Sequence, residues 1–145
     1  MSPIPTAIER LASIEQDMSL HGISYAADQL ELFLEEFDLS DKTLSDKVLN
    51  LRLQILIGQG KFEELKEVLD HAEVSSLETE IRCLMSQGIL ANRNQDYRAS
   101  LIYFLDAEAK AKDIKIDRLL AQIQINIGTV YAGLHHYQEG LDRYS

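Results

Sequence analysis

After Pro5 the chain contains no further proline through to Ser145. The ring and missing N–H of proline break helices, so the strongest helix-breaking residue is absent from nearly the whole chain. Apolar residues recur three or four positions apart instead of alternating with polar ones, as an early stripe shows at Ile8, Leu11, Ile14 and Met18. This is the spacing of amphipathic α-helices. The sequence therefore predicts an all-α fold.

Short segments of glycine and polar residues interrupt the helical pattern. They occur at 21–22, 59–61, 92–96 and 133–136. Two longer joints, at 38–42 and 74–77, contain the Asp and Ser residues that often begin helices. Helices joined by such short connections pack antiparallel on their sequence neighbours. We expect about seven to eight helices arranged in this way.

An aromatic residue follows three of the breaks, and these residues lie 35 and 40 positions apart: Phe62, Tyr97 and Tyr137. Nine positions before each aromatic stands a small or apolar residue, namely Leu53, Gly88 and Gly128. A weaker first copy centres on Ile23. Periods of this length indicate a repeat protein. We divide the chain into four units of one helical domain, at about 6–40, 44–74, 77–112 and 116–145.

The last copy, with Asn126 to Tyr131 followed by Tyr137 and Gly140, resembles the tetratricopeptide repeat family. The long period is similar to the variant found in bacterial regulatory proteins. The resemblance implies a solenoid of antiparallel helix pairs, in which Gly88 and Gly128 let paired helices approach closely. The family's proline at the repeat end is missing in every copy. Another kind of helical-pair solenoid is the alternative.

Only eight residues follow Tyr137, and they stop in mid-helix without a polar closing helix. Solenoids need terminal units with a polar outer face. We therefore expect the chain to be the N-terminal part of a longer protein. The alternative is a natural protein with a ragged end.

The chain carries 14 basic and 24 acidic residues, a net charge of −10. This charge argues against a free-standing nucleic-acid binder. No apolar run reaches the roughly 18 residues of a membrane span, and no signal pattern opens the chain, so we expect a cytoplasmic protein without membrane partners. Ten acidic and only two basic residues fall within 1–46. This acidic first repeat either keeps the module soluble or docks a basic partner segment.

Candidate catalytic and metal-binding patterns are weak. Cys83 is the only cysteine, so neither a disulfide nor a thiolate metal cage can form within the chain. Lys61 is followed by Phe62 where a phosphate-binding loop needs Ser or Thr. The adjacent His135 and His136 would point about 100° apart on a helix and could not share a metal. We predict no enzymatic activity and no cofactor or metal.

The resemblance implies that the first helix of each pair lines a concave groove for a protein or peptide. Asn126 stands where the family often has an asparagine that bonds the backbone of a bound peptide. Three of the groove residues are basic and would form a spot suited to a carboxylate. The expected groove residues are Lys47, Asn50, Gln54, Arg82, Ser86, Arg93, Gln122, Asn126 and Thr129.

The function implied by the resemblance is that of a non-catalytic binding module. It would be the N-terminal sensory or regulatory part of a multidomain signalling protein, and it would control an output domain. The alternative is structural: self-association near the C-terminal end, through Tyr131, Tyr137 and Tyr144, would set the oligomeric state.

Overall fold

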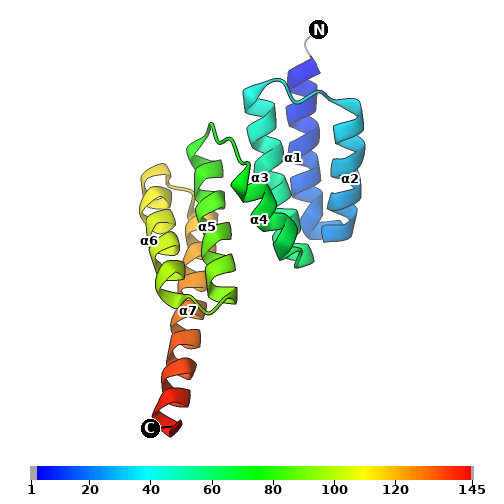
Figure 1. Cartoon of the computed structure of the whole chain (residues 1–145). Coiled ribbons are helices and arrows are strands. Elements are labelled where there is room, and N and C mark those ends of the chain that lie inside the picture. Colours follow the sequence, from blue (N-terminus) through cyan, green and yellow to red (C-terminus); the bar gives the residue numbers. More distant parts are fainter. Residues whose placement is uncertain (1–2, 145) are drawn as a thin grey trace. The chain divides into compact units, whose positions relative to one another are not determined.

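The computed structural model describes residues 3–144, with side chains for residues 5–139 and 141. This part of the chain contains seven α-helices and no strand (Figure 1), so the all-α prediction is confirmed. The chain divides into two compact units, Met1–Glu80 and Ile81–Ser145. The helices are α1 (Pro3–His21), α2 (Ile23–Glu36), α3 (Lys42–Gln59), α4 (Phe62–Asp70), α5 (Leu77–Arg93), α6 (Tyr97–Ile114) and α7 (Asp117–Tyr144).

Local side-chain and backbone chemistry sets most helix ends. The carboxylate of Asp41 accepts a hydrogen bond from the Leu44 N–H at 2.9 Å and begins α3, and Asp96 begins α6 in the same way through Ala99. These are N-cap interactions. Gly60 ends α3 in the left-handed conformation that glycine adopts without strain, at φ +69°. The predicted breaks at these positions are confirmed.

The predicted break at 133–136 is wrong, because α7 runs through it without interruption. A Cβ atom at Gly133 would lie 2.8 Å from Cε1 of Tyr97. Glycine is therefore needed here because α6 and α7 approach closely, and not because the chain turns. The residues expected to form an eighth helix belong to α7.

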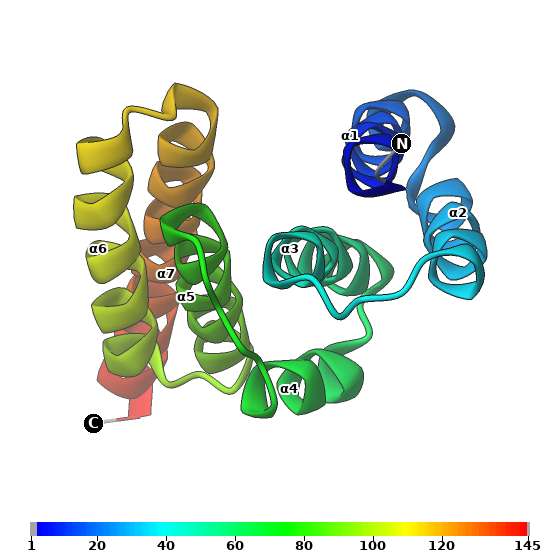
Figure 2. The same ribbon diagram turned by 90° about the horizontal axis from the view of Figure 1, so that it is seen from above.

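In unit 1, α1 packs against α2 and α3, and both α2 and α4 pack against α3 (Figure 2). A salt bridge between Arg10 and Glu36 joins α1 to the end of α2. The Arg10 guanidinium also lies 5.7 Å from the ring centroid of Phe37, within cation–π range. The core of the unit is apolar and includes Leu30, Phe33, Leu44, Leu51 and Ile55.

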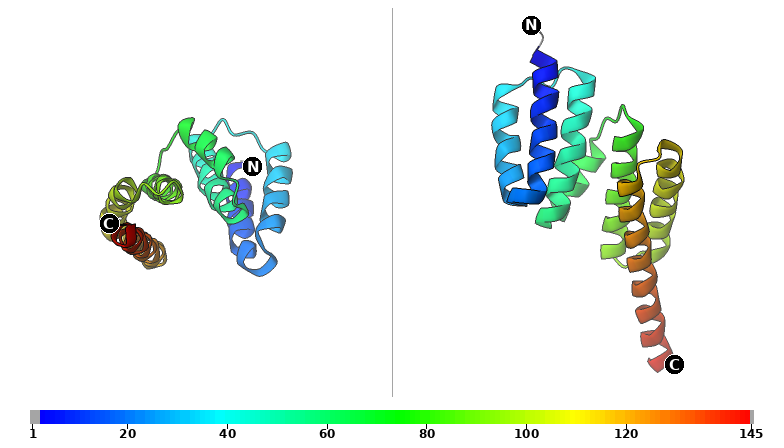
Figure 3. Two further views of the ribbon diagram at one scale, coloured as in Figure 1. Left: turned by 60° about the horizontal axis from the view of Figure 1, so that its bottom comes forward. Right: turned by 180° about the vertical axis from the view of Figure 1, so that it is seen from behind.

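In unit 2, α6 and α7 pack together with the later turns of α5 around a second core (Figure 3). Gly88 on α5 permits this packing, since a Cβ atom there would lie 2.7 Å from the Phe104 ring. The expected close approach at Gly88 is confirmed. The same expectation for Gly128 is wrong, because no atom lies within 4 Å of a Cβ placed there. The core includes Ile81, Met85, Phe104, Leu119, Ile123 and Val130.

Candidate functional site

A buried carboxylate joins α3 to the start of α5 within unit 1. Asp46 is only 4% exposed and accepts hydrogen bonds from the hydroxyls of Ser76 at 2.6 Å and Thr79 at 2.7 Å. The backbone N–H groups of Ser75 and Ser76 donate to it at 2.8 and 3.2 Å. The Ser76 hydroxyl in turn accepts from the Thr79 N–H at 3.2 Å, which makes Ser76 the N-cap of α5.

These hydrogen bonds control the ionisation of Asp46. Burial by itself raises the pKa of this carboxyl, but the hydrogen bonds from Ser76, Ser75 and Thr79 outweigh burial, so the pKa lies below its ordinary value. The carboxylate is ionised at neutral pH, and four donors already occupy its oxygens. Such a group serves poorly as a general base, because it holds its proton too weakly. Asp46 is therefore a structural anchor.

A hollow of about 260 Å³ lies beside this anchor and is lined by α1, α3 and the first turn of α5. Two of the expected groove residues, Lys47 and Asn50, lie in its wall. Lys47 is exposed, whereas Asn50 is 8% exposed and donates to the Thr79 hydroxyl at 3.3 Å. The Gln54 amide donates to the Asn50 side-chain oxygen at 2.8 Å. Of the three residues expected on α3, Lys47 is thus exposed, Gln54 is half-buried and Asn50 is buried. We call this site the Lys47 hollow.

In unit 2 the structure brings together two expected groove residues from different helices. Nη1 of Arg82 on α5 donates to Oε1 of Gln122 on α7 at 3.1 Å. Asn126 lies one turn beyond Gln122 and is half-buried. Ser86, in contrast, is fully buried, and its hydroxyl donates to the Arg82 carbonyl at 2.8 Å. Ser86 therefore offers no surface to a ligand.

The remaining expected residues lie further from this pair. Arg93 is exposed at the end of α5, eleven residues after Arg82, or about 16 Å along a helix. Thr129 is exposed on α7, and its hydroxyl donates to the Ile125 carbonyl at 3.1 Å. Arg82 and Arg93 therefore do not form the single basic spot that the sequence suggested, and Lys47 belongs to the other compact unit.

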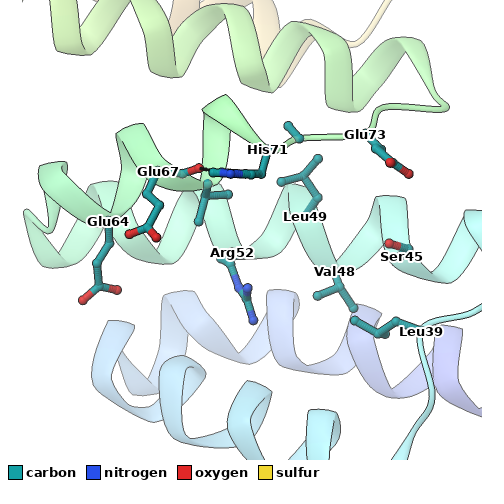
Figure 4. A pocket seen from close by; sticks show the side chains of 11 residues that line it. Leu39, Ser45, Val48, Leu49, Arg52, Glu64, Glu67, His71 and Glu73 are labelled. Carbon is teal, nitrogen blue, oxygen red and sulfur yellow. Dashed lines mark hydrogen bonds between the residues drawn. The ribbon is translucent and has the colours of Figure 1, made fainter.

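Another hollow of unit 1 was missed by the sequence reasoning. It measures about 690 Å³ and is lined by α3, α4 and the segments next to them, with Arg52 at its centre (Figure 4). Arg52 lies one turn after Leu49 and one turn before Leu56, on a face of α3 that is otherwise apolar. Arg52, a charged residue within an apolar stripe, was the feature of the sequence that could have indicated this hollow.

The histidines are engaged in local contacts. Nε2 of His135 lies 3.1 Å from a carboxylate oxygen of Glu139, one turn further along α7. Nδ1 of His71 lies 3.0 Å from the Glu67 carbonyl oxygen, as Figure 4 shows. Within the described residues, no group of three or more potential metal-ligating side chains comes together. Nor does any described helix contain a stretch long and apolar enough to cross a membrane.

Comparisons with known proteins give no match to this chain. No protein-family model matches the chain. Searches of curated proteins and of solved structures likewise give no match.

Proposed function

We propose that the chain is a non-catalytic module that binds a protein or peptide, built from tetratricopeptide-like antiparallel helix pairs that form a solenoid. In this proposal it is a cytoplasmic regulatory part of a multidomain signalling protein, and binding controls an output domain. Support comes from the all-helical fold, from the close packing at Gly88, and from open hollows on helix faces.

The Lys47 hollow is the observation that carries the proposal. Its volume of about 260 Å³ is just below the range of roughly 300–1,000 Å³ that is typical of sites for whole small molecules. A hollow of this size suits a side chain or a chain terminus better than a cofactor. The exposed ammonium of Lys47 offers a charged hydrogen-bond donor to the oxygens of a peptide, in a lining that also contains the carboxylates of Glu15, Asp46 and Glu78.

The polar face of unit 2 provides a second contact region. Arg82 and Gln122 are already positioned by their mutual hydrogen bond, and the Asn126 amide can both donate to and accept from a peptide backbone. A ligand carboxylate that replaced the Gln122 oxygen would set an ionised acceptor opposite the Arg82 guanidinium, which can hold a carboxylate through two parallel hydrogen bonds.

Peptides selected from a random library against the whole chain provide the test, with Kd measured by fluorescence anisotropy. Loss of one charge-assisted contact removes about 1.5–3 kcal/mol, which corresponds to roughly a ten- to hundredfold weaker Kd. We expect this loss for Lys47→Ala, and at least as large a loss for Arg82→Ala combined with Asn126→Ala.

The matched control is Glu63→Ala, an exposed position on α4 that lines neither the Lys47 hollow nor the polar face of unit 2. It should change Kd by less than about twofold, and circular dichroism should show the same helicity for all variants. If Glu63→Ala weakened binding while Lys47→Ala and the Arg82 and Asn126 pair did not, both contact regions would be wrong.

Self-association is the second candidate function, favoured by the large apolar rings on the surface of α7. Tyr131 is 53% exposed and Tyr137 is 52% exposed, while the side chain of Tyr144 lies outside the described residues. If these rings form an interface, light scattering will give a dimer or larger assembly, and Tyr131→Ser with Tyr137→Ser will convert it to monomer. A monomer at all concentrations would contradict this alternative.

A further inference from the structure

Within the described part of unit 1, the backbones of α2 and α4 both approach α3 closely but do not approach one another in the same way. The surface of α3 between them is therefore open. Two hollows, of about 690 and 340 Å³, lie along it and share the residues Arg52, Glu64 and Val68. We treat them as one groove and call it the Arg52 groove.

Apolar side chains from three helices form much of the groove. Together they form an apolar floor on which one face of a bound segment can pack. Grooves of this kind bind amphipathic helices, whose apolar side chains recur at positions i, i+3, i+4 and i+7. The apolar side chains include Leu30, Leu34, Val48, Ile55, Leu56 and Val68.

Carboxylates stand on both walls of the groove. Glu31 lies on α2, and Glu64 and Glu67 lie on α4; all three are exposed. Figure 4 shows Glu64 and Glu67 extending from α4 toward the side to which Arg52 points from α3. None of the three glutamates makes a salt bridge with another described residue. The exposed Lys61 also lines the groove, but the acidic side chains outnumber the basic ones, so the groove presents net negative charge to whatever lies in it.

We infer that the Arg52 groove binds an amphipathic helix of a partner protein, with an apolar stripe on the groove floor and lysine or arginine residues beside the glutamates. An acidic partner is disfavoured by the glutamates, and a second copy of this chain would bring another net charge of −10. Arg52 at the centre disfavours a basic residue directly above it, so it also sets the register of the helix.

This inference rests on the proposed binding function but uses another face of unit 1. The Lys47 hollow faces α1 and the start of α5, whereas the Arg52 groove lies between α2 and α4. The two sites share no lining residue. Each can therefore be removed without changing the other.

The probe is a fluorescein-labelled peptide of leucine and lysine, about 14 residues long, with its leucines at helical spacing. Its companion has glutamate in place of lysine. We expect the leucine–lysine peptide to bind the whole chain at least tenfold more tightly than its companion, as measured by fluorescence anisotropy. Replacement of wall charges by Glu64→Lys with Glu67→Lys should weaken binding of the leucine–lysine peptide at least tenfold.

The matched control is Glu63→Lys with Asp70→Lys, which makes the same change in charge on the same helix but outside the groove. It should weaken binding less than about threefold. Arg52→Gln should strengthen binding severalfold, because it removes the positive charge from the groove floor. Thermal melts by circular dichroism establish that each variant is folded.

Equal weakening by the groove pair and the control pair would overturn the inference, since it would mean general attraction to an acidic protein. Equal binding of the two peptides would overturn it too.

Lys47→Ala should leave binding of the leucine–lysine peptide unchanged. If the leucine–lysine peptide binds as expected but no selected peptide depends on Lys47, the Lys47 hollow is not a binding site, whereas the Arg52 groove is supported. If selected peptides depend on Lys47 but the leucine–lysine peptide does not bind, the inference about the Arg52 groove is wrong and the proposed Lys47 site is supported.

Discussion

At the scale of single residues, Asp46 shows how one buried charge can be kept within an α-helical unit. Two hydroxyl groups and two backbone N–H groups surround its carboxylate, so the ion loses little by leaving water. The donors all come from the segment that begins α5. Asp46 thereby fixes a loop that has few apolar contacts of its own, since Ser75 and Ser76 are exposed residues.

We expect Asp46→Ala to lower the free energy of unfolding by about 2–4 kcal/mol, because it leaves several donors without their charged acceptor. Urea denaturation followed by circular dichroism measures this loss. The control is Asp38→Ala, which removes an exposed carboxylate that accepts two hydrogen bonds from Ser40. It should lower the free energy of unfolding by less than about 1 kcal/mol. Similar losses for the two variants would show that Asp46 is not an anchor.

The lowered pKa of Asp46 also predicts how stability depends on pH. A carboxyl whose pKa is lower in the folded protein than in the unfolded chain stabilises the fold above the unfolded value, which is about 3.8. This stabilisation is lost as the pH falls from about 4 through the pKa of the folded state. The wild-type chain should therefore lose more stability than Asp46→Asn between pH 5 and pH 3. Parallel losses in urea melts would contradict the prediction.

At the scale of helices, two glycines on the helices of unit 2 have opposite surroundings. Gly88 lies against the Phe104 ring, and its carbonyl accepts a hydrogen bond from the Ser100 hydroxyl at 2.7 Å. Gly128 lies in open space. The sequence pattern predicted a close helix approach at both glycines, because it contains no information on whether a neighbouring helix lies against the residue.

We expect the same substitution to act in opposite directions at these two glycines. Gly88→Ala should destabilise the chain by about 1–3 kcal/mol, because its methyl group would overlap the Phe104 ring. Gly128→Ala should stabilise it by about 0.5–1 kcal/mol, because alanine is the better helix former. Differential scanning calorimetry would show the two shifts in Tm. Shifts of the same sign would contradict the packing described for α5 and α6.

At the scale of the whole molecule, the chain has two apolar cores that share no residue. The core of unit 1 uses residues up to Ile55, and that of unit 2 begins at Ile81. The boundary between the units falls within α5, whose first turn is hydrogen-bonded to Asp46. A substitution that destabilises one core should therefore increase local unfolding mainly in the unit that contains that core.

Phe33→Ala and Phe104→Ala test this separation, since each truncates a fully buried ring in one core. Each should cost about 3–5 kcal/mol. Hydrogen exchange measured by mass spectrometry should show faster exchange in α1–α3 for Phe33→Ala and in α6–α7 for Phe104→Ala. If either variant accelerated exchange equally in both units, the chain would unfold as one cooperative body.

Local chemistry explains why much of the helical architecture could be predicted from the sequence. The spacing of apolar residues indicates helices whatever they pack against, and Asp41, Gly60 and Asp96 end or begin helices through contacts within a few residues. The sequence could also place Lys47 and Arg82 on the helices that carry them. These features depend on short stretches of chain, so a single sequence contains the information.

Only the tertiary structure decided which helix faces are covered. Gly133 lies against Tyr97, Asn50 and Ser86 are buried, and Arg52 lines a groove between α2 and α4. Each outcome depends on residues that are distant in the chain. The sequence by itself determined the helices and many of their ends, because hydrogen bonds and apolar periodicity are local. The open and buried faces were decided by packing between segments, which a periodic pattern does not encode.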